Sequence, residues 1–329
     1  MSQSGWWWAA AGLVLLCKQG SYTGQVSATA RPVPLDCSVF GTTEAVGDAW
    51  SWLVLSDAII DDTRRFDAFQ SRLGIARSTL SARLVGLCAN GLMVQDGREY
   101  LLTDAGMDFL MCALTAMAWG DRWYTDGVDV PVRVAHLGCA DGIHGELRCK
   151  ACGEVVDARD VRFNRRPEAL DLRGEASQRR RVPGMDLLQR RRPSSVAATL
   201  RIIGDRWSAL IIRELFYGST RFDEFQRHLG IATNILSQRL QRHVEHGIVD
   251  RRAYQLRPMR HEYKLTDKGL DLYPVPLSML AWGDRWLSDR QGPVRLTHLL
   301  CGKRLTPRLC CSNCTLPIAR EDVAFTHQH

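Results

Sequence analysis

The sequence predicts a mainly α chain with small β-hairpins (an α+β fold), built from one structural unit used twice. The segment 65–76 (RFDAFQSRLGIA) returns as 221–232 (RFDEFQRHLGIA), an offset of 221 − 65 = 156. In both copies, apolar residues at helical spacing precede a short connection containing Gly, and a second helical pattern follows. Such self-similarity at a fixed offset indicates a tandem duplication of a helix-turn-helix unit.

The elements around each helix-turn-helix follow the same order. A first helix is expected to carry the Gly-Asp-x-Trp block at 47–50 or 204–207, together with an apolar run. A two-strand hairpin is expected at 92–102 or 248–265, then a long final helix that begins at Thr103 or Thr266. That helix ends at a Trp-Gly-Asp-Arg-Trp block, whose aromatic residues we expect in core or dimer packing rather than stacked on single-stranded nucleic acid. The prediction is two winged helix-turn-helix domains, each followed by a small Cys/His hairpin extension.

Composition and charge divide the chain further. The net charge of +7 and the local arginine runs favour a polyanionic partner. No stretch is long and apolar enough to span a bilayer, and the apolar run 6–17 lacks the preceding basic residue of a signal peptide. A cytoplasmic, nucleoid-associated protein is therefore expected.

The expected parts are an N-terminal extension, predicted to be disordered (1–34), a divergent winged-helix domain 1 (35–130), Cys/His knuckle 1 (131–163), a basic linker (164–192), winged-helix domain 2 (193–292), and Cys/His knuckle 2 with a tail (293–329).

The second helix of each helix-turn-helix carries a polar face of the side-chain types that hydrogen-bond base edges and phosphates. In the second copy, Thr233 is expected to cap this helix, and the longer hairpin adds arginines suited to phosphate or minor-groove contact. A solvated helix and a solvated loop are the alternative interpretations. Binding to double-stranded DNA is predicted through Arg77, Ser78, Thr79, Ser81 and Arg83 in the first copy and Thr233, Asn234, Ser237, Gln238, Arg239, Arg242, Arg257 and Arg260 in the second.

Each winged-helix unit is followed by the same pattern, His-x2-Cys-x9-Cys-x2-Cys, at an offset of 298 − 136 = 162. One His and three Cys match a tetrahedral structural zinc site, so one zinc ion per repeat is expected. Two alternatives stay open: a redox dithiol, although no βαβ pattern surrounds it, and a strand hairpin whose thiols bind no metal. The expected ligands are His136, Cys139, Cys149 and Cys152 in the first copy and His298, Cys301, Cys311 and Cys314 in the second.

Several blocks of the second copy together resemble one known family. They are GDRW at 204–207, IREL at 212–215, RFDEF at 221–225, LSQRL at 236–240, YKLT at 263–266 and AWG at 281–283. The set is similar to the HxlR-type winged helix-turn-helix regulators, which are relatives of the MarR group. The resemblance covers most of both copies, but the first copy departs from the family pattern at two places. Ala49 replaces the Arg of the Gly-Asp-Arg-Trp block, and Ser56-Asp57 stands where the second copy has Arg213-Glu214.

The resemblance implies a bacterial DNA-binding transcriptional regulator rather than an enzyme. Such regulators are usually homodimers, so two copies in one chain form either an intramolecular pseudo-dimer or part of a larger homodimer. The alternative function is a protein-interaction scaffold in which DNA binding is lost or non-specific. Some members of the family sense oxidants through a cysteine just before the first helix, the position of Cys37; an inert buried cysteine is the other interpretation.

Overall fold

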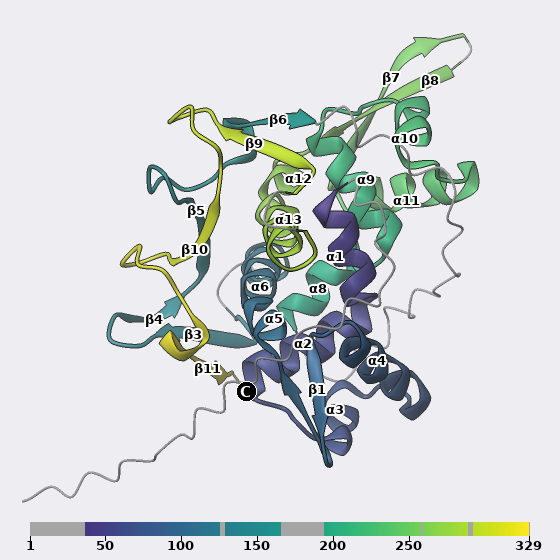
Figure 1. The fold of residues 1–329 in the computed structure, drawn as a ribbon. Coiled ribbons are helices and arrows are strands. Elements are labelled where there is room, and N and C mark those ends of the chain that lie inside the picture. The colour runs from purple at the N-terminus through teal and green to yellow at the C-terminus, as the bar shows by residue number, and fades with distance from the viewer. Residues whose placement is uncertain (1–36, 126–128, 166–193, 258, 289–291, 329) are drawn as a thin grey trace, which may run out of the picture. The chain divides into compact units, whose positions relative to one another are not determined.

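The computed structural model describes residues 37–125, 129–165, 194–257, 259–288 and 292–328. The expected N-terminal extension (1–34) lies outside the described residues, as does nearly all of the expected basic linker (164–192). We call residues 35–163 repeat 1 and residues 193–329 repeat 2. Both repeats contain a helix-turn-helix followed by a hairpin, which confirms the predicted fold class (Figure 1).

Repeat 1 begins with four helices and a short hairpin. Its elements are α1 (Ser38–Val46), α2 (Ala49–Asp61), α3 (Phe66–Leu73), α4 (Arg77–Ala89), β1 (Met93–Asp96), β2 (Glu99–Leu102), α5 (Asp104–Asp108) and α6 (Leu110–Tyr124). Repeat 2 has the matching elements α8 (Ser195–Ile203), α9 (Arg206–Phe216), α10 (Phe222–Leu229), α11 (Thr233–Glu245), β7 (Val249–Leu256), β8 (Met259–Leu265), α12 (Asp267–Asp271) and α13 (Pro274–Trp286).

Two expected helices are each divided in the structure. The expected first helix is two helices, because Gly47 adopts φ 98° and Asp48 then caps α2 by accepting hydrogen bonds from the backbone N–H of Trp50 and Ser51. The expected final helix is a short α5 and a long α6 that meet at Phe109. Thr103 caps α5, because its hydroxyl accepts a hydrogen bond from the backbone N–H of Gly106.

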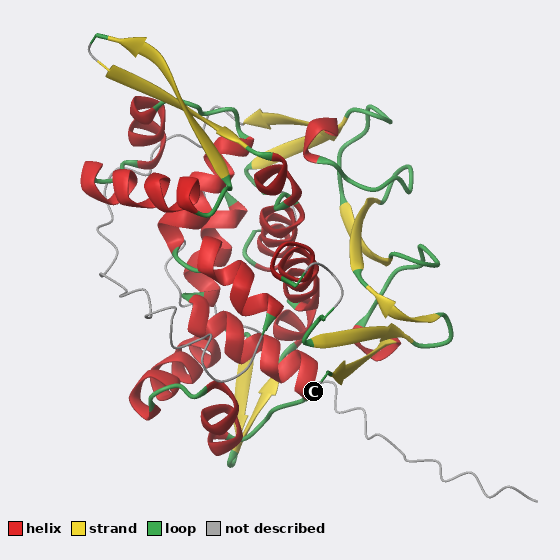
Figure 2. Cartoon of the chain, turned by 180° about the vertical axis from the view of Figure 1, so that it is seen from behind, coloured by secondary structure: helices red, strands yellow, loops and turns green. Residues whose placement is uncertain are grey.

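The described helices α1, α6, α8 and α13 pack the two repeats against each other. Helix α6 of repeat 1 lies along α8 and α13 of repeat 2, and α1 lies along α13. Thr115 and Ser278, which occupy equivalent positions (278 − 115 = 163), share a hydroxyl–hydroxyl hydrogen bond of 3.1 Å. A two-fold relation produces such contact between equivalent residues at its axis. In both views the two helix-turn-helix motifs lie on opposite sides of these four helices (Figures 1 and 2).

The Trp-Gly-Asp-Arg-Trp blocks belong to this inter-repeat packing, as expected. The indole N–H of Trp119 donates to the carbonyl of Lys268 (3.1 Å), and that of Trp282 donates to the carbonyl of Ala105 (2.9 Å). Each bond links the repeats, and the two bonds are equivalent, because the offset of 163 relates Trp119 to Trp282 and Ala105 to Lys268. Gly120 and Gly283 let the backbones of α8 and α1 approach, because a Cβ at either position would overlap Ser195 or Ser38. No described helix is long and apolar enough to cross a membrane.

The Cys/His extensions form a layer of short strands beside α6 and α13 (Figure 1). Repeat 1 supplies β3 (Val132–His136), β4 (Ala140–Ile143), β5 (Gly145–Cys149) and β6 (Val161–Arg165). Repeat 2 supplies β9 (Val294–His298), β10 (Pro307–Cys311) and β11 (Val323–His327). The pairs β5–β10, β3–β11 and β6–β9 are all antiparallel, and each joins one repeat to the other.

The register of these strands shows the same two-fold exchange. Leu147 pairs with Leu309, its own equivalent at the offset 309 − 147 = 162. The same offset relates Val161 to Val323 and His136 to His298, so the pairs Val161–His298 and Val323–His136 are equivalent. Each repeat therefore contributes the strands that complete the extension of the other.

Candidate nucleic-acid interface and Cys/His groups

The second helix of each helix-turn-helix is held by a buried apolar face. In α11 this face includes Leu236 and Leu240, and in α4 it includes Leu80, Leu84 and Leu87. Helix α11 begins at Thr233, but its N-cap is the preceding residue, Ala232, and no side chain caps the helix by a hydrogen bond. The expected cap by Thr233 is therefore wrong: its hydroxyl instead accepts a hydrogen bond from the side-chain amide of Gln226, 2.8 Å away.

The opposite faces of these helices present most of the predicted DNA-binding residues to solvent. Arg77 lies with its guanidinium 5.0 Å from the ring centre of Phe66, at the start of α4. Thr79 is half-buried. The exposed members of the predicted set on the two helices are Arg77, Ser78, Ser81, Thr233, Asn234, Ser237 and Gln238.

Three of the predicted arginines are engaged within the protein. Arg83 pairs with Asp48 at 2.5 Å, and Arg239 pairs with Asp205 at 3.1 Å. Because both acids cap the helix that precedes the helix-turn-helix, these equivalent pairs fasten α4 to α2 and α11 to α9. Arg242 donates to the carbonyl of Arg201 at 2.5 Å and is half-buried. The duplication of both partners, Asp in the Gly-Asp-x-Trp block and Arg in the second helix, was a signal in the sequence that could have revealed these pairs.

His243, which the sequence places on the polar face of α11, is fully buried. Neither of its ring nitrogens has a hydrogen-bond partner among the residues that the structure describes. Burial lowers the pKa of His243 to about 4, so the imidazole is neutral at physiological pH. The equivalent residue in repeat 1 is the buried Leu87 (243 − 156 = 87), which shows that the position is apolar.

The two hairpins differ as the sequence predicted. Strands β1 and β2 are short, whereas β7 and β8 extend further and pair out to Leu256 and Met259. Arg257 and Arg260 are exposed near the tip of this longer wing. Further along β7, the guanidinium of Arg221 lies 4.9 Å from the ring centre of Tyr254.

Repeat 1 keeps the internal contacts of a helix-turn-helix although its sequence diverges. In repeat 2, Glu214 of α9 accepts a 3.0 Å contact from Nδ1 of His228 on α10. In repeat 1, Asp57 of α2 pairs with Arg72 of α3 at 2.9 Å, and 228 − 156 = 72. Both partners have changed together, so the same acid–base link joins the same two helices.

Cys37 lies at the N-terminus of α1, as predicted, but it is buried. Its side chain is 1% exposed, and its sulfur accepts from the backbone N–H of Val39 at 3.3 Å. The sulfur also lies 3.5 Å from the hydroxyl of Tyr217 in repeat 2. Ser194 takes the equivalent capping position on α8. This environment favours the interpretation of a packed cysteine over that of an accessible sensor.

The eight Cys/His residues gather into two groups of four, and each group could hold a metal ion. Within a group, the candidate ligand atoms all lie within 4.8 Å of one another. The expectation that each repeat builds its own group is wrong, because each group takes two residues from each repeat. Group A is His136, Cys139, Cys311 and Cys314; group B is Cys149, Cys152, His298 and Cys301.

Strand geometry explains why the groups cross between the repeats. β5 is extended and rises about 3.3 Å per residue, so it carries Cys149 roughly 13 Å along the strand from Gly145. Cys311 pairs with Gly145 at the start of β5, whereas Cys149 pairs with Pro307 at its end. The antiparallel register thus brings the second cysteine pair of each repeat to the first half of the other repeat's pattern.

The turns that present the sulfurs are locally well defined. The backbone N–H of Gly153 donates to the carbonyl of Cys149, and that of Thr315 donates to the carbonyl of Cys311. Gly153 adopts φ 81°, and Thr315, its counterpart in repeat 2, adopts the same left-handed region at φ 63°. A β-branched residue rarely adopts this conformation, so the surrounding contacts must impose it.

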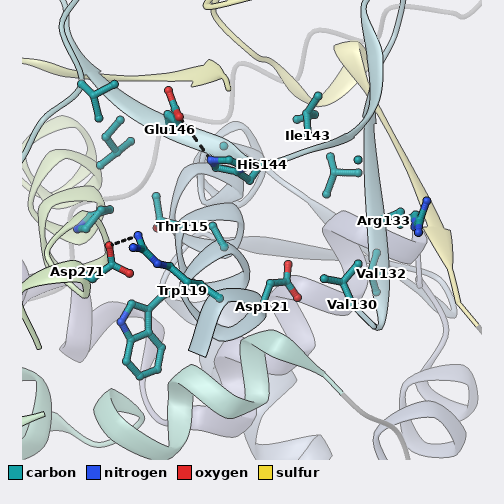
Figure 3. A pocket seen from close by; sticks show the side chains of 18 of the residues that line it. Thr115, Trp119, Asp121, Val130, Val132, Arg133, Ile143, His144, Glu146 and Asp271 are labelled. Carbon is teal, nitrogen blue, oxygen red and sulfur yellow. Dashed lines mark hydrogen bonds and ion pairs between the residues drawn. The ribbon is translucent and has the colours of Figure 1, made fainter. Parts of the chain in front are cut away.

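A pocket of about 710 Å³ lies between α6 and the strand layer (Figure 3). Val130, Val132 and Ile143 line one wall, and Asp271 of repeat 2 faces the opposite side, paired with Arg122. Burial raises the pKa of Asp121 in this lining to about 6, while the hydroxyl of Ser195 opposes the shift. Because both repeats line the pocket, its shape depends on how they pack together.

Taken together, two helix-turn-helix motifs, each with a wing and an exposed polar second helix, define a protein of the winged-helix class. The family model for HxlR-like helix-turn-helix proteins matches residues 45–127 and 202–291, which together make up 83 + 90 = 173 of the 329 residues. The chain belongs to this family of transcriptional regulators, which are not enzymes. Family membership does not favour the scaffold alternative.

Individual relatives match about one repeat. An HTH-type transcriptional regulator of Mycobacterium tuberculosis is 42% identical over 139 residues, which is 42% of this chain and 88% of that protein. The HTH-type transcriptional regulator YdeP of Bacillus subtilis is 35% identical over 92 residues, 28% of this chain and 72% of its own.

Solved structures also cover one repeat at a time. The protein in the crystal structure of PA1607 is 41% identical, and the match covers 41% of this chain and 92% of that one, with a TM-score of 0.35. The redox regulator HypR in its reduced form is 36% identical, covers 28% and 91%, and has a TM-score of 0.27. The family assignment therefore rests on the sequence match.

Proposed function

We propose that this transcriptional regulator binds DNA sequence-specifically, with α4 and α11 entering major grooves. The observation that carries the proposal is the exposed polar face of α11. Asn234 and Ser237 are exposed on it, they make no side-chain hydrogen bond among the described residues, and both types can donate to and accept from base edges. The helix is fixed beneath by Leu236 and Leu240, so these side chains are presented by a rigid element.

The contacts divide into base-reading, phosphate-binding and positioning residues. We infer base or adjacent phosphate contacts for Arg77, Ser78, Thr79 and Ser81 of α4 and for Thr233, Asn234, Ser237 and Gln238 of α11. Arg257 and Arg260 of the longer wing bind phosphate or the minor groove in this proposal. Arg83, Arg239 and Arg242 are assigned to positioning, because their ion pairs or hydrogen bonds hold the helices in place.

We infer that the two repeats act as an intramolecular pseudo-dimer. This inference is supported by the equivalent contacts of Trp119 with Lys268 and Trp282 with Ala105, and by relatives whose length is close to that of one repeat. Two recognition helices of a dimeric helix-turn-helix protein bind half-sites about 34–36 Å apart, one turn of DNA or a multiple of it. The differences between the wings and between α4 and α11 predict two unlike half-sites.

The test is the affinity of the full-length protein for DNA upstream of its own gene, compared with a random duplex across a salt series. Specific binding should persist where random binding is lost, and the footprint should cover two half-sites. Asn234→Ala should cost about 1–3 kcal/mol at the half-site of repeat 2 and relax its sequence preference.

The matched control is Arg133→Gln, which removes one exposed positive charge from strand β3, away from the recognition helices. Arg77→Gln should weaken binding more than this control does. Equal weakening of specific and random DNA, or equal effects of Arg77→Gln and Arg133→Gln, would contradict base recognition. A footprint of one half-site would contradict the pseudo-dimer but leave DNA recognition by one repeat in place.

A further inference from the structure

We propose that each Cys₃His group binds one Zn²⁺ ion and that each ion joins the two repeats. Three thiols and one imidazole form a donor set typical of structural zinc, with every coordination position taken by the protein. Because the ligands of each ion come from both repeats, the ions would connect the repeats to each other. This proposal is independent of the proposed contacts with DNA.

The distances in the structure fit a tetrahedral site. For Zn–S near 2.3 Å and Zn–N near 2.0–2.1 Å, a sulfur and a nitrogen ligand lie about 3.6 Å apart. In group A, the sulfur of Cys314 lies 3.2 Å from Nδ1 of His136. In group B, the sulfurs of Cys152 and Cys301 lie 3.3 Å and 3.5 Å from Nδ1 of His298. The same ring nitrogen faces the sulfurs in both groups.

The groups are also oriented by their surroundings. His298 is fully buried, and its other ring nitrogen has no hydrogen-bond partner among the described residues, so the sulfurs are the polar atoms that this imidazole faces. In group A, the amide of Asn313 in repeat 2 donates to the sulfur of Cys139 in repeat 1 at 3.2 Å. A donor to a thiolate sulfur is the type of outer contact that tunes a metal site.

Zinc would add to the stability of the strand layer. Each pairing between the repeats in this layer involves short strands of five residues. Of these strands, β5 and β10 pack on α6 and α13, and a bound structural metal contributes folding free energy directly. One ion near each end of the β5–β10 pair would hold both ends of that pair. Binding requires loss of the thiol protons of the three cysteines to solvent.

The experiment measures zinc in full-length protein purified under reducing conditions without chelator, using crossed double variants. Wild-type protein should hold two zinc ions per chain. Cys139→Ala with Cys314→Ala removes two ligands from group A, so one ion should remain. Cys139→Ala with Cys152→Ala removes one ligand from each group although both lie in one repeat, so zinc content should fall toward zero. The matched control Cys88→Ala, outside both groups, should keep two.

Sites formed within each repeat would give the reverse pattern: one ion in the Cys139/Cys152 variant and loss of both in the Cys139/Cys314 variant. That result would overturn the inter-repeat assignment. Replacement of zinc by Co²⁺ in wild-type protein should give sulfur-to-metal charge-transfer absorption with saturation at two equivalents, a readout that needs no variant to fold. Wild-type protein with fully reduced thiols that binds neither zinc nor Co²⁺ would overturn the metal assignment itself, whatever its affinity for DNA.

Discussion

Gly120 of helix α6 lies against the backbone at the start of α8. A Cβ at this position would lie 2.7 Å from the carbonyl carbon of Ser195 and closer still to its oxygen. Both are backbone atoms of the other repeat, so relief requires the two helices to separate. We therefore expect Gly120→Ala to lower the free energy of unfolding by about 1–3 kcal/mol, as overpacking does in other cores. This loss would appear although alanine is favoured over glycine within a helix by about 1 kcal/mol.

Gly86 of α4 is the matched control, because it also lies within a helix and its Cβ would meet nothing within 4 Å. Gly86→Ala should raise the free energy of unfolding by about 0.5–1 kcal/mol. Gly283→Ala, the repeat 2 counterpart of Gly120→Ala, should destabilise because its Cβ would lie 2.7 Å from the hydroxyl of Thr42. Urea unfolding followed by circular dichroism gives all three values. If Gly120→Ala stabilised the protein as much as Gly86→Ala, the packing of α6 on α8 would be refuted.

Two further predictions concern buried polar groups. His243 has a pKa of about 4 when folded against 6.5 as its ordinary value, so the unfolded chain binds the proton first as pH falls; the contribution of His243 to stability should decline from pH 6.5 to 4 by up to roughly 3 kcal/mol, while Asp121, whose pKa is raised to about 6, contributes in the opposite direction. His243→Leu should abolish this decline and add about 1–3 kcal/mol at neutral pH, and an unchanged pH profile of unfolding would contradict the assignment. Arg239→Gln should cost about 1–3 kcal/mol of stability, because Asp205 would lose its ion pair and keep only its hydrogen bonds from Ser208. Lost DNA affinity with unchanged thermal unfolding would instead indicate that Arg239 leaves Asp205 to bind DNA.

Much of the fold follows from local sequence patterns. The apolar spacing of Phe225 and Leu229, followed by Gly230, predicts the helix-turn-helix, and Gly230 indeed adopts φ 60° at the end of α10. The Asp-Gly turn at 96–97 predicts the short wing. These features depend on residues close together in the chain, so a single sequence contains the information. The break between α1 and α2 was missed although Gly47-Asp48 carried its signal, a glycine followed by a capping aspartate.

The polar face of α11 illustrates a limit of helical periodicity. Spacing alone places His243 and Arg239 with the exposed residues of that helix. The structure buries His243, because α11 packs against both α9 and β7 and the buried surface is wider than one apolar stripe. Arg239 forms an ion pair with Asp205, which lies 34 residues earlier in the chain. Comparison with repeat 1 could have predicted the burial of His243, because the equivalent residue there is the apolar Leu87.

The division of the Cys/His residues could not be derived from spacing, because two arrangements share the same spacing. Groups formed within a repeat and groups formed between repeats both combine one His-x2-Cys half with one Cys-x2-Cys half. The choice depends on whether β5 folds back on its own repeat or pairs with β10, and the pairing of Leu147 with Leu309 shows the second. Among the described residues, the strand pairs that join the repeats all follow the same exchange, so a change of register in β5–β10 would move the cysteines of both groups. The eight residues are therefore evidence about the assembly of the two repeats as much as about metal binding. Neither repeat contains a complete group by itself, so each needs the Cys/His residues of the other.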